Sequence, residues 1–320
     1  MVEFHVQEAI SCAAWMENRH FGDEEQMKEK SIEIRPVTDV ADARKLEVIQ
    51  RQTWGMSAIE VLPGRFLHAM HFNGACLLGA YDGAELIGFV FGLLGTVEGL
   101  DDRIDQVAAA RLQMYSAIMG VLPEYQSAGI GYRLKVAQRE FALRIGVRLI
   151  TWTYDPLEGR NGYLNIRKLG VVCNQYERDF HGQVGGINAG LPTDRFYVEW
   201  WVTSNRAKGR LAARRPPLTL DNYLSGGAVI VNRTERDDRD FVVPSADFER
   251  VGSRFVLVEI PNSIQIIKDQ DMGLAGAWRA HTREQFEHYF AQNYLLTDFI
   301  RFEDSGGFWR SYYVLTLGDS

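Results

Sequence analysis

The first half of the chain alternates between strand-like and helix-like patterns of apolar residues. Residues 32–39 alternate with the period of a strand, and residues 40–55 repeat apolar positions with the period of a helix that Thr38 or Asp39 can cap. Residues 75–95 hold two apolar runs split by Asp82-Gly83, which predicts a β-hairpin. The order of strand, helix and hairpin predicts a mixed sheet covered by helices.

The pattern continues with a buried strand over 114–123, two glycines and a helix over 132–147 with Leu134, Ala137, Phe141 and Ile145 on one face. Further along we expect a strand, a short helix closed by Gly170, and two more strands, over residues 148–156, 161–170, 171–182 and 194–202. The last third predicts a strand, a long helix and two strands, over 254–261, 270–292, 294–302 and 310–317.

These elements predict an α/β (α+β) fold with a mixed central sheet flanked by helices and a smaller C-terminal α+β region. We expect four segments: an N-terminal extension, a main domain, a basic linker and the C-terminal region, over residues 1–31, 32–205, 206–217 and 218–320. The basic run over 206–215 stands before two prolines, which favours a solvated linker over a nucleic-acid-binding arm.

Composition excludes several classes of protein. The formal net charge of -7 argues against a general nucleic-acid binder, which needs clustered Lys and Arg. The three cysteines form no CxxC pair, and His68 and His71 lack a third ligand nearby, so we expect neither disulfides nor a metal site. Without a secretory signal pattern or a long apolar run, we expect a cytoplasmic protein with no membrane partner.

The chemistry is concentrated in "GVLPEYQSAGIGYRL", residues 120–134. Gln126, Gly129 and Gly131 form a Q-x-x-G-x-G pattern between a strand and a helix, where unpaired backbone N–H groups can bind a phosphate. The spacing fits neither a Walker A loop nor a dinucleotide fingerprint. A simple turn at the start of a helix is the alternative.

This stretch resembles the acyl-CoA-binding motif of the GNAT N-acetyltransferase superfamily. The resemblance extends over roughly residues 32–203. Within the superfamily, the chain looks most like poorly characterised members that carry an extra C-terminal region. The resemblance implies that backbone groups of Met119, Gly120 and Val121 pair with pantetheine, and that Asn161 makes a weaker contact with coenzyme A. It also implies that N–H groups of the loop hold the pyrophosphate, namely those of Ser127, Ala128, Gly129, Ile130, Gly131 and Tyr132.

The resemblance fails at the residue that protonates the leaving thiolate. Many GNAT enzymes use a tyrosine, but the matching position is Ile166 or Lys168, depending on the register. We name three substitutes: Tyr115, which strand alternation would place on one face with Ala117 and Met119; Asp155, at the end of the next strand; and Tyr176. Core tyrosines and a turn aspartate are the alternative readings of these residues.

The sequence therefore predicts an acyl-CoA-dependent N-acyltransferase, with acetyl-CoA as donor and a small-molecule amine such as an amino acid as acceptor. A succinyl-type donor and a non-catalytic acyl-CoA-binding module stay open, and a nucleic-acid-associated protein is the weakest alternative. We expect no nucleic-acid partner, and a homodimer is open. On the last long helix, Arg279 and Arg283 are expected to be solvated charges, with a contact to a carboxylate substrate as the alternative.

Overall fold

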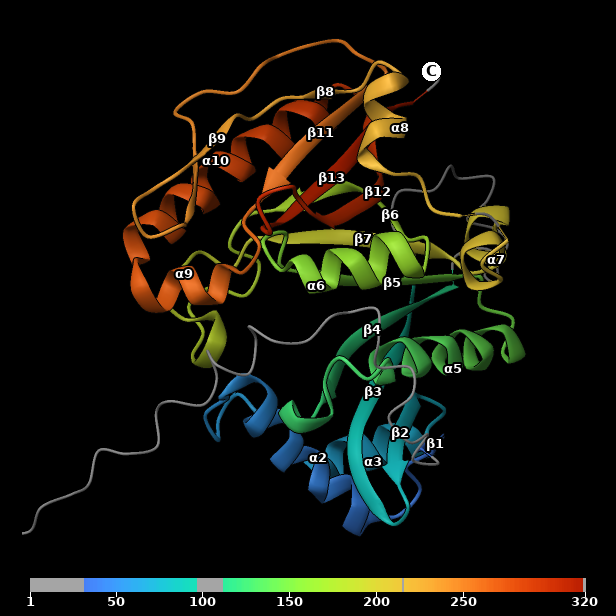
Figure 1. Cartoon of the computed structure of the whole chain (residues 1–320). Helices are drawn as coiled ribbons and strands as arrows, with labels where there is room; N and C mark the ends of the chain where they lie inside the picture. The colour runs from blue at the N-terminus through green and yellow to red at the C-terminus, as the bar shows by residue number, and fades with distance from the viewer. Residues whose placement is uncertain (1–31, 97–111, 215, 319–320) are drawn as a thin grey trace, which may run out of the picture.

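The computed structural model describes residues 32–96, 112–214 and 216–318. The expected N-terminal extension, 1–31, lies outside the described residues. In the described part, eleven strands form one sheet in the order β1-β2-β3-β4-β5-β7-β6-β12-β13-β11-β8 (Figure 1). The expected α/β fold, with a large, mostly antiparallel sheet flanked by helices, is confirmed.

The N-terminal part of the sheet contains the expected strand, helix and hairpin. Its elements are β1 (Ile32–Pro36), α2 (Val40–Trp54), α3 (Gly64–Phe72), β2 (Cys76–Asp82), β3 (Glu85–Thr96) and β4 (Leu112–Val121). Asp39 caps α2 by accepting a hydrogen bond from the Ala41 N–H at 2.7 Å. The hairpin turns between Asp82 and Glu85, where Gly83 has a φ of 61°.

The central part carries the glycine loop, residues 126–131. Its elements are η2 (Pro123–Tyr125), α5 (Ile130–Arg144), β5 (Leu149–Tyr154), α6 (Gly159–Gly162), the π-helix η3 (Tyr163–Lys168), β6 (Val172–Glu177), η4 (Gly186–Asn188) and β7 (Arg195–Trp201). Strands β4 and β5 are parallel, whereas β5, β7 and β6 pair antiparallel. Helices α2 and α5 lie on opposite faces of the sheet, since a Cβ on Gly120 of β4 would meet Trp54 and one on Gly92 of β3 would meet Gln138.

The C-terminal part extends the same sheet. Its elements are α7 (Asn205–Leu211), α8 (Leu220–Ser225), β8 (Val229–Ile230), β9 (Thr234–Arg236), β10 (Val242–Pro244), β11 (Phe255–Ile260), α9 (Ile264–Gln270), α10 (Met272–Ala291), β12 (Tyr294–Glu303) and β13 (Trp309–Leu317). The expected long helix over 270–292 is α10, whereas the preceding helix α9 was not expected. Asp271 separates the two helices and caps α10 by accepting from the Leu274 N–H at 2.9 Å.

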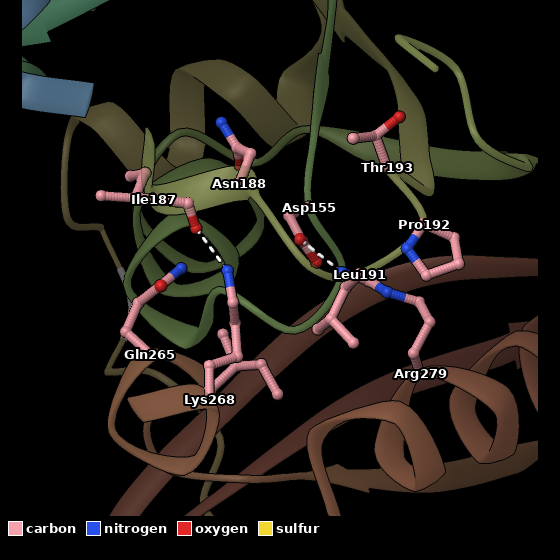
Figure 2. A pocket seen from close by; sticks show the side chains of 10 residues that line it. Asp155, Ile187, Asn188, Leu191, Pro192, Thr193, Gln265, Lys268 and Arg279 are labelled. Carbon is pink, nitrogen blue, oxygen red and sulfur yellow. Dashed lines mark hydrogen bonds and ion pairs between the residues drawn. The ribbon is translucent and has the colours of Figure 1, made fainter. Parts of the chain in front are cut away.

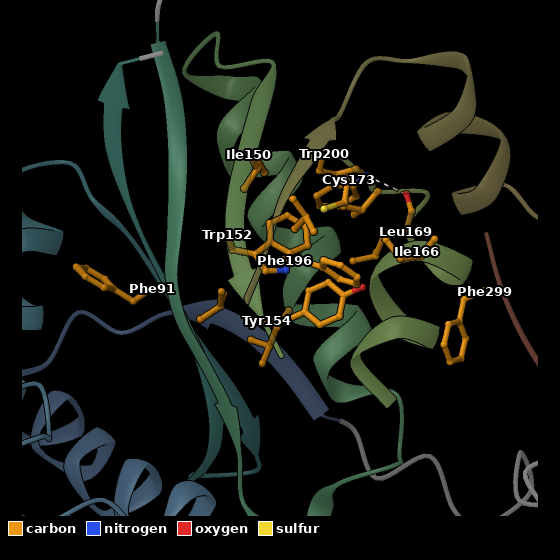
Figure 3. Close-up of a cluster of buried hydrophobic side chains, with 14 of the residues drawn as sticks. Phe91, Ile150, Trp152, Tyr154, Ile166, Leu169, Cys173, Phe196, Trp200 and Phe299 are labelled. Carbon is orange, nitrogen blue, oxygen red and sulfur yellow. Dashed lines mark hydrogen bonds between the residues drawn. The ribbon is translucent and has the colours of Figure 1, made fainter. Parts of the chain in front are cut away.

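The larger of two hydrophobic clusters contains residues from Val37 to Leu315. Phe196 of β7 lies edge-on to Phe286 of α10 and Tyr313 of β13, with ring centroids 4.7 Å and 5.4 Å away. Figure 3 shows Phe196 between Tyr154 and the Trp152–Trp200 pair. The predicted domain boundaries stay predictions, since a shared sheet and core join the segments on either side of residues 206–217.

The basic run differs from the expected solvated linker. Its first half is helix α7, in which the Arg206 Nε donates to the Gly170 carbonyl at 3.0 Å. Arg210 forms an ion pair with Asp298 of β12 at 2.9 Å. These basic side chains pack against the protein because β12 places the buried carboxylate of Asp298 beside them. The local sequence does not reveal this long-range contact.

Candidate active site

Strands β4 and β5 separate where the candidate residues gather. They pair only at Met114↔Ile150 and Tyr115↔Thr151, whereas β4 continues beside β3 as far as Val121. Beyond Tyr115 the two parallel strands therefore leave an open wedge. A cleft of about 2290 Å³ includes this wedge, and both strands contribute to its wall.

A β-bulge marks the start of the wedge. Between Tyr115 and Ile118 of β4 there is one residue more than between Leu93 and Phe91 of β3, so Ser116 and Ala117 lie opposite Gly92. The extra residue reverses the side-chain alternation. The expectation that Tyr115 shares a face with Met119 is therefore wrong: Tyr115 shares the face of Gly120, which looks toward Trp54, whereas Met119 contacts Gly131 on the α5 side.

The backbone of β4 presents alternate residues to the wedge. The Leu122 N–H donates to Ile87 of β3 at 2.9 Å, so by antiparallel alternation the backbone groups of Gly120 also face β3. Those of Met119 and Val121 face away from β3. The expected pantetheine contact of Gly120 stays a prediction. The lack of a side chain at Gly120 makes room for Trp54, because a Cβ there would lie 2.7 Å from the Trp54 ring.

The glycine loop closes one end of the cleft. Ser127 and Gly129 both adopt left-handed backbone conformations, with φ of 66° and 73°. Gly129 is the N-cap of α5 and accepts the Arg133 N–H, while no side chain caps the helix. The first N–H groups of α5 consequently lack helical partners, and they carry the positive end of the helix dipole.

Arg160 adds positive charge to this loop. Its guanidinium donates to the Gln126 Oε1 at 3.2 Å and to the Ser127 Oγ at 3.3 Å. The Gln126 Nε2 in turn donates to the Val121 carbonyl at 3.0 Å, which ties the loop to the end of β4. Sequence reasoning missed Arg160 because α6 brings it to the loop from 34 positions along the chain. Asn161 follows it and also lines the cleft.

A lysine is buried beneath the bulge. The side chain of Lys135 of α5 donates to the Ser116 Oγ at 2.7 Å and to the Gln138 Oε1 at 3.2 Å, and its Nζ lies 3.7 Å from the centre of the Trp152 ring. Burial lowers the pKa of Lys135 to about 7. The expected apolar stripe of α5 is only partly right: Leu134 is buried, but Lys135 and Gln138 are buried with it and Ile145 is exposed.

The three candidate catalytic residues have different surroundings. Tyr115 is half-buried in the cleft wall and shares a hydrogen bond with Thr153; burial is the main cause that raises its pKa. Asp155 also lines the cleft, but its carboxylate is held by Arg279 at 2.5 Å and accepts the Leu157 N–H at 2.8 Å. This second contact matches the alternative reading of Asp155 as a turn residue.

Tyr176 lies outside the cleft that Tyr115 and Asp155 line. Its hydroxyl donates to the Asp194 Oδ2 at 2.7 Å, and its ring stacks on Phe286 with centroids 6.2 Å apart. Burial raises its pKa, and it does not line the cleft. The arrangement supports the alternative reading of Tyr176 as a core aromatic with a satisfied hydroxyl.

A long loop also lines the cleft. The β6–β7 connection, residues 178–194, touches the α2–α3 connection where the Gly185 N–H donates to the Glu60 Oε1 at 2.8 Å. Glu60 also accepts from the Ser57 hydroxyl at 2.6 Å, and these bonds, that of Ser57 first, lower its pKa to about 2. Both connections line the cleft, so a substrate could reach the wedge from this side.

The described segments meet neither the requirements of a metal site nor those of a membrane-spanning helix. Across 32–96, 112–214 and 216–318, no three His, Cys, Asp or Glu side chains gather into a set that could hold a metal ion. No helix in these segments has both the length and the apolar character needed to cross a bilayer.

No protein-family model and no curated protein matches the chain. Solved structures do match. An acetyltransferase of the GNAT family from Desulfovibrio desulfuricans has 15% identity and a TM-score of 0.40, over 54% of this chain and 99% of its own. The acetyltransferase yncA from Salmonella typhimurium, solved with acetyl-CoA, has 16% identity and a TM-score of 0.42, over 55% and 96%.

Arabidopsis thaliana NAA60 in complex with acetyl-CoA has 18% identity and a TM-score of 0.43, over 54% of this chain and 99% of its own. Identities and TM-scores of this size do not transfer an activity from those proteins. The chain is similar to GNAT-type acetyltransferase structures over about half of its length, as residues 120–134 predict.

Proposed function

We propose that the chain is an acyl-CoA-dependent N-acyltransferase with acetyl-CoA as donor and the amine of a small molecule, such as an amino acid, as acceptor. The wedge between β4 and β5 is the observation that carries this proposal. An extended pantetheine arm has amide groups that can pair with the outward backbone groups of Met119 and with the outward N–H of Val121, whose carbonyl already accepts from Gln126 and Thr53. Its pyrophosphate would then accept hydrogen bonds from the first turn of α5 and from Arg160.

The proposed reaction needs positioning more than a covalent intermediate. The uncharged amine attacks the thioester carbonyl, forms the C–N bond and gives one proton to solvent; the C–S bond then breaks, and the thiolate takes up one proton. The bulge at Ser116 leaves backbone groups outside the β3–β4 ladder, and an N–H there would polarise the carbonyl.

Tyr115 is the proposed proton donor to the thiolate. It is the last β4 residue paired with β5, so its side chain lies at the narrow end of the wedge. Burial favours its neutral form, which is the form that can give a proton. Asp155, engaged by Arg279, is a poorer candidate, and Tyr176 has its hydroxyl bound to Asp194.

Thiol release tests the proposal. The chain is incubated with acetyl-CoA and a panel of amines, and free coenzyme A is measured with a thiol reagent; amine-dependent release is expected. Succinyl-CoA in a parallel series tests the succinyl-type donor. No release with any donor, although acetyl-CoA binds, would reject the transferase.

That last outcome would favour a non-catalytic acyl-CoA-binding module, the second candidate function. One observation favours it: Ile166, at one register of the usual tyrosine, is fully buried in the core. The π-helix η3 directs this residue away from the cleft, although its neighbours Leu164 and Asn165 line the wall. A sensor needs the cleft but not the acid.

A further inference from the structure

A second, small pocket adjoins the cleft on the side of the β6–β7 connection. It has a volume of about 10 Å³ and lies between this connection, α9 and α10. Asp155, Ile187, Asn188 and Gln265 line both the pocket and the cleft, so the two spaces share a wall. Figure 2 shows Lys268 and Arg279 reaching this wall from α9 and α10.

Arg279 is buried at this pocket with unused donors. Its side chain is 3% exposed, and its Nη2 donates to the Asp155 Oδ2 at 2.5 Å. The buried Nε and Nη1 atoms have no hydrogen-bond partner within the described segments. Leaving buried guanidinium donors unbonded is costly, because they have lost their hydration without a replacement. The expectation of a solvated Arg279 is therefore wrong.

Cationic hydrogen-bond donors line the pocket. Arg279 and Lys268 line it, and Arg195 lies 3.5 Å from the Asp155 carboxylate. The acids that interact with these cations are Asp155, Glu158, Asp194 and Asp269. Of these, Asp194 is already bound by Arg283, and burial raises the pKa of Glu158 toward its neutral form. The Lys268 Nζ donates to the Ile187 carbonyl at 2.6 Å, which leaves its other two N–H bonds for a ligand. The pocket thus favours an anion.

Arg283, one turn further along α10, has no such role. Its Nε and Nη2 donate to the two carboxylate oxygens of Asp194 at 2.7 Å and 2.8 Å. This bidentate pair is complete in itself. Arg283 therefore provides a matched control on the same helix.

We propose that Arg279 and Lys268 bind the carboxylate of the acyl acceptor, which makes a free amino acid the class of acceptor. A volume of about 10 Å³ holds one water-sized group, so one carboxylate oxygen fits whereas a phosphate group does not. The shared wall lets the rest of the acceptor, including its amine, extend into the cleft. The inference rests on the proposed acyltransferase function and adds the acceptor's second charged group.

The experiment compares amino acids with their carboxamides, which keep the amine and the side chain but lose the carboxylate charge. The kcat/KM for each acid and its amide is measured with acetyl-CoA for the full chain and for Arg279→Gln, Lys268→Met and Arg283→Gln. Circular dichroism and acetyl-CoA binding by calorimetry verify that each variant is folded. Lys268 is half-buried and pairs with no acid in the described segments, so its variant keeps the test valid if Arg279→Gln does not fold.

The unaltered chain is expected to prefer acids over amides by at least about tenfold, the worth of one charge-assisted hydrogen bond. Arg279→Gln should bring the ratio close to 1, Lys268→Met should lower it several-fold, and Arg283→Gln should leave it unchanged. Equal use of acids and amides by the unaltered chain, or an unchanged ratio in both pocket variants, would overturn the inference.

A binding experiment covers the case of no turnover. Calorimetry of the chain loaded with coenzyme A is repeated with N-acetyl amino acids and with N-acetyl amino amides. Binding of the acids alone, lost in Lys268→Met, supports the pocket. Absence of acid binding overturns it, whereas retained acetyl-CoA binding leaves the cofactor site of the proposed function intact, so the two failures are distinguishable.

Discussion

Lys135 donates a hydrogen bond to Ser116 at 2.7 Å, so a buried amine of α5 is fixed to the bulge of β4. The bond links the helix that starts at the glycine loop to the point where the wedge opens. With the Lys135 side chain above the Trp152 ring of β5, one residue contacts both strands of the wedge. Its position therefore connects the geometry of the glycine loop with that of β4 at the start of the wedge.

Lys135→Met is expected to change how stability depends on pH. The folded-state pKa of Lys135, about 7, lies below its ordinary value of 10.5, so between these pH values the unfolded chain binds more protons than the folded one. Stability of the unaltered chain should rise with pH in this window, by at most about 1.4 kcal/mol per pH unit from this group. The stability of Lys135→Met, compared with that of the unaltered chain, should therefore fall as the pH rises through this window.

Urea unfolding at pH 6.5, 8 and 9.5 measures this difference. Leu134→Ala is the control: Leu134 is equally buried on the same helix, is uncharged and is not a hydrogen-bond partner of Lys135, so its effect should not vary with pH. A constant difference for Lys135→Met across the three pH values would contradict the lowered pKa.

Tyr115→Phe should lower kcat by roughly a hundredfold, the low end of the usual contribution of a general acid or base, with little effect on the KM for acetyl-CoA. Tyr176→Phe is the matched comparison, since it removes a hydroxyl that bonds to Asp194 outside the cleft. It should reduce stability by about 1 kcal/mol and leave kcat unchanged. A loss of kcat in Tyr176→Phe, with kcat unchanged in Tyr115→Phe, would contradict the assignment of Tyr115 as the proton donor.

Arg160→Gln should weaken acetyl-CoA binding by about tenfold, because the loop loses the charge beside Gln126 and Ser127 that would face the pyrophosphate at the proposed site. The loss should shrink as salt is added. Arg139→Gln is the control on α5, where the Arg139 Nε donates to the Val202 carbonyl instead. Equal weakening in both variants would mean that general charge, and not the loop contact, holds the cofactor.

Local patterns were enough to predict the elements around the glycine loop. The hairpin at Asp82 and the helix after Gly129 follow from turn chemistry and apolar spacing, and both are confirmed. The cleft could be predicted only from the resemblance to the GNAT motif, because the pairing between β4 and β5 depends on residues far apart in the chain. No local signal shows where two parallel strands part.

The remaining features depend on long-range packing. The bulge at Ser116 arises opposite Gly92, whose missing side chain also leaves space for Gln138. Arg279 lies 124 positions from Asp155 in the chain, so its burial could not be read from the polar pattern of its own helix. Polar residues that are buried by distant partners are the ones that sequence reasoning assigned to solvent.

The most direct test of the coenzyme A site is a calorimetric titration of acetyl-CoA into the unaltered chain, Gly129→Glu and Gly146→Glu. Both glycines have positive φ, 73° and 80°, and a Cβ added at either would meet nothing within 4 Å, so the two variants add the same charge and the same strain at opposite ends of α5. Saturable binding by the unaltered chain and Gly146→Glu, with its loss in Gly129→Glu, is predicted. Equal affinity in all three proteins, or no binding to the unaltered chain, would contradict a coenzyme A site at the glycine loop.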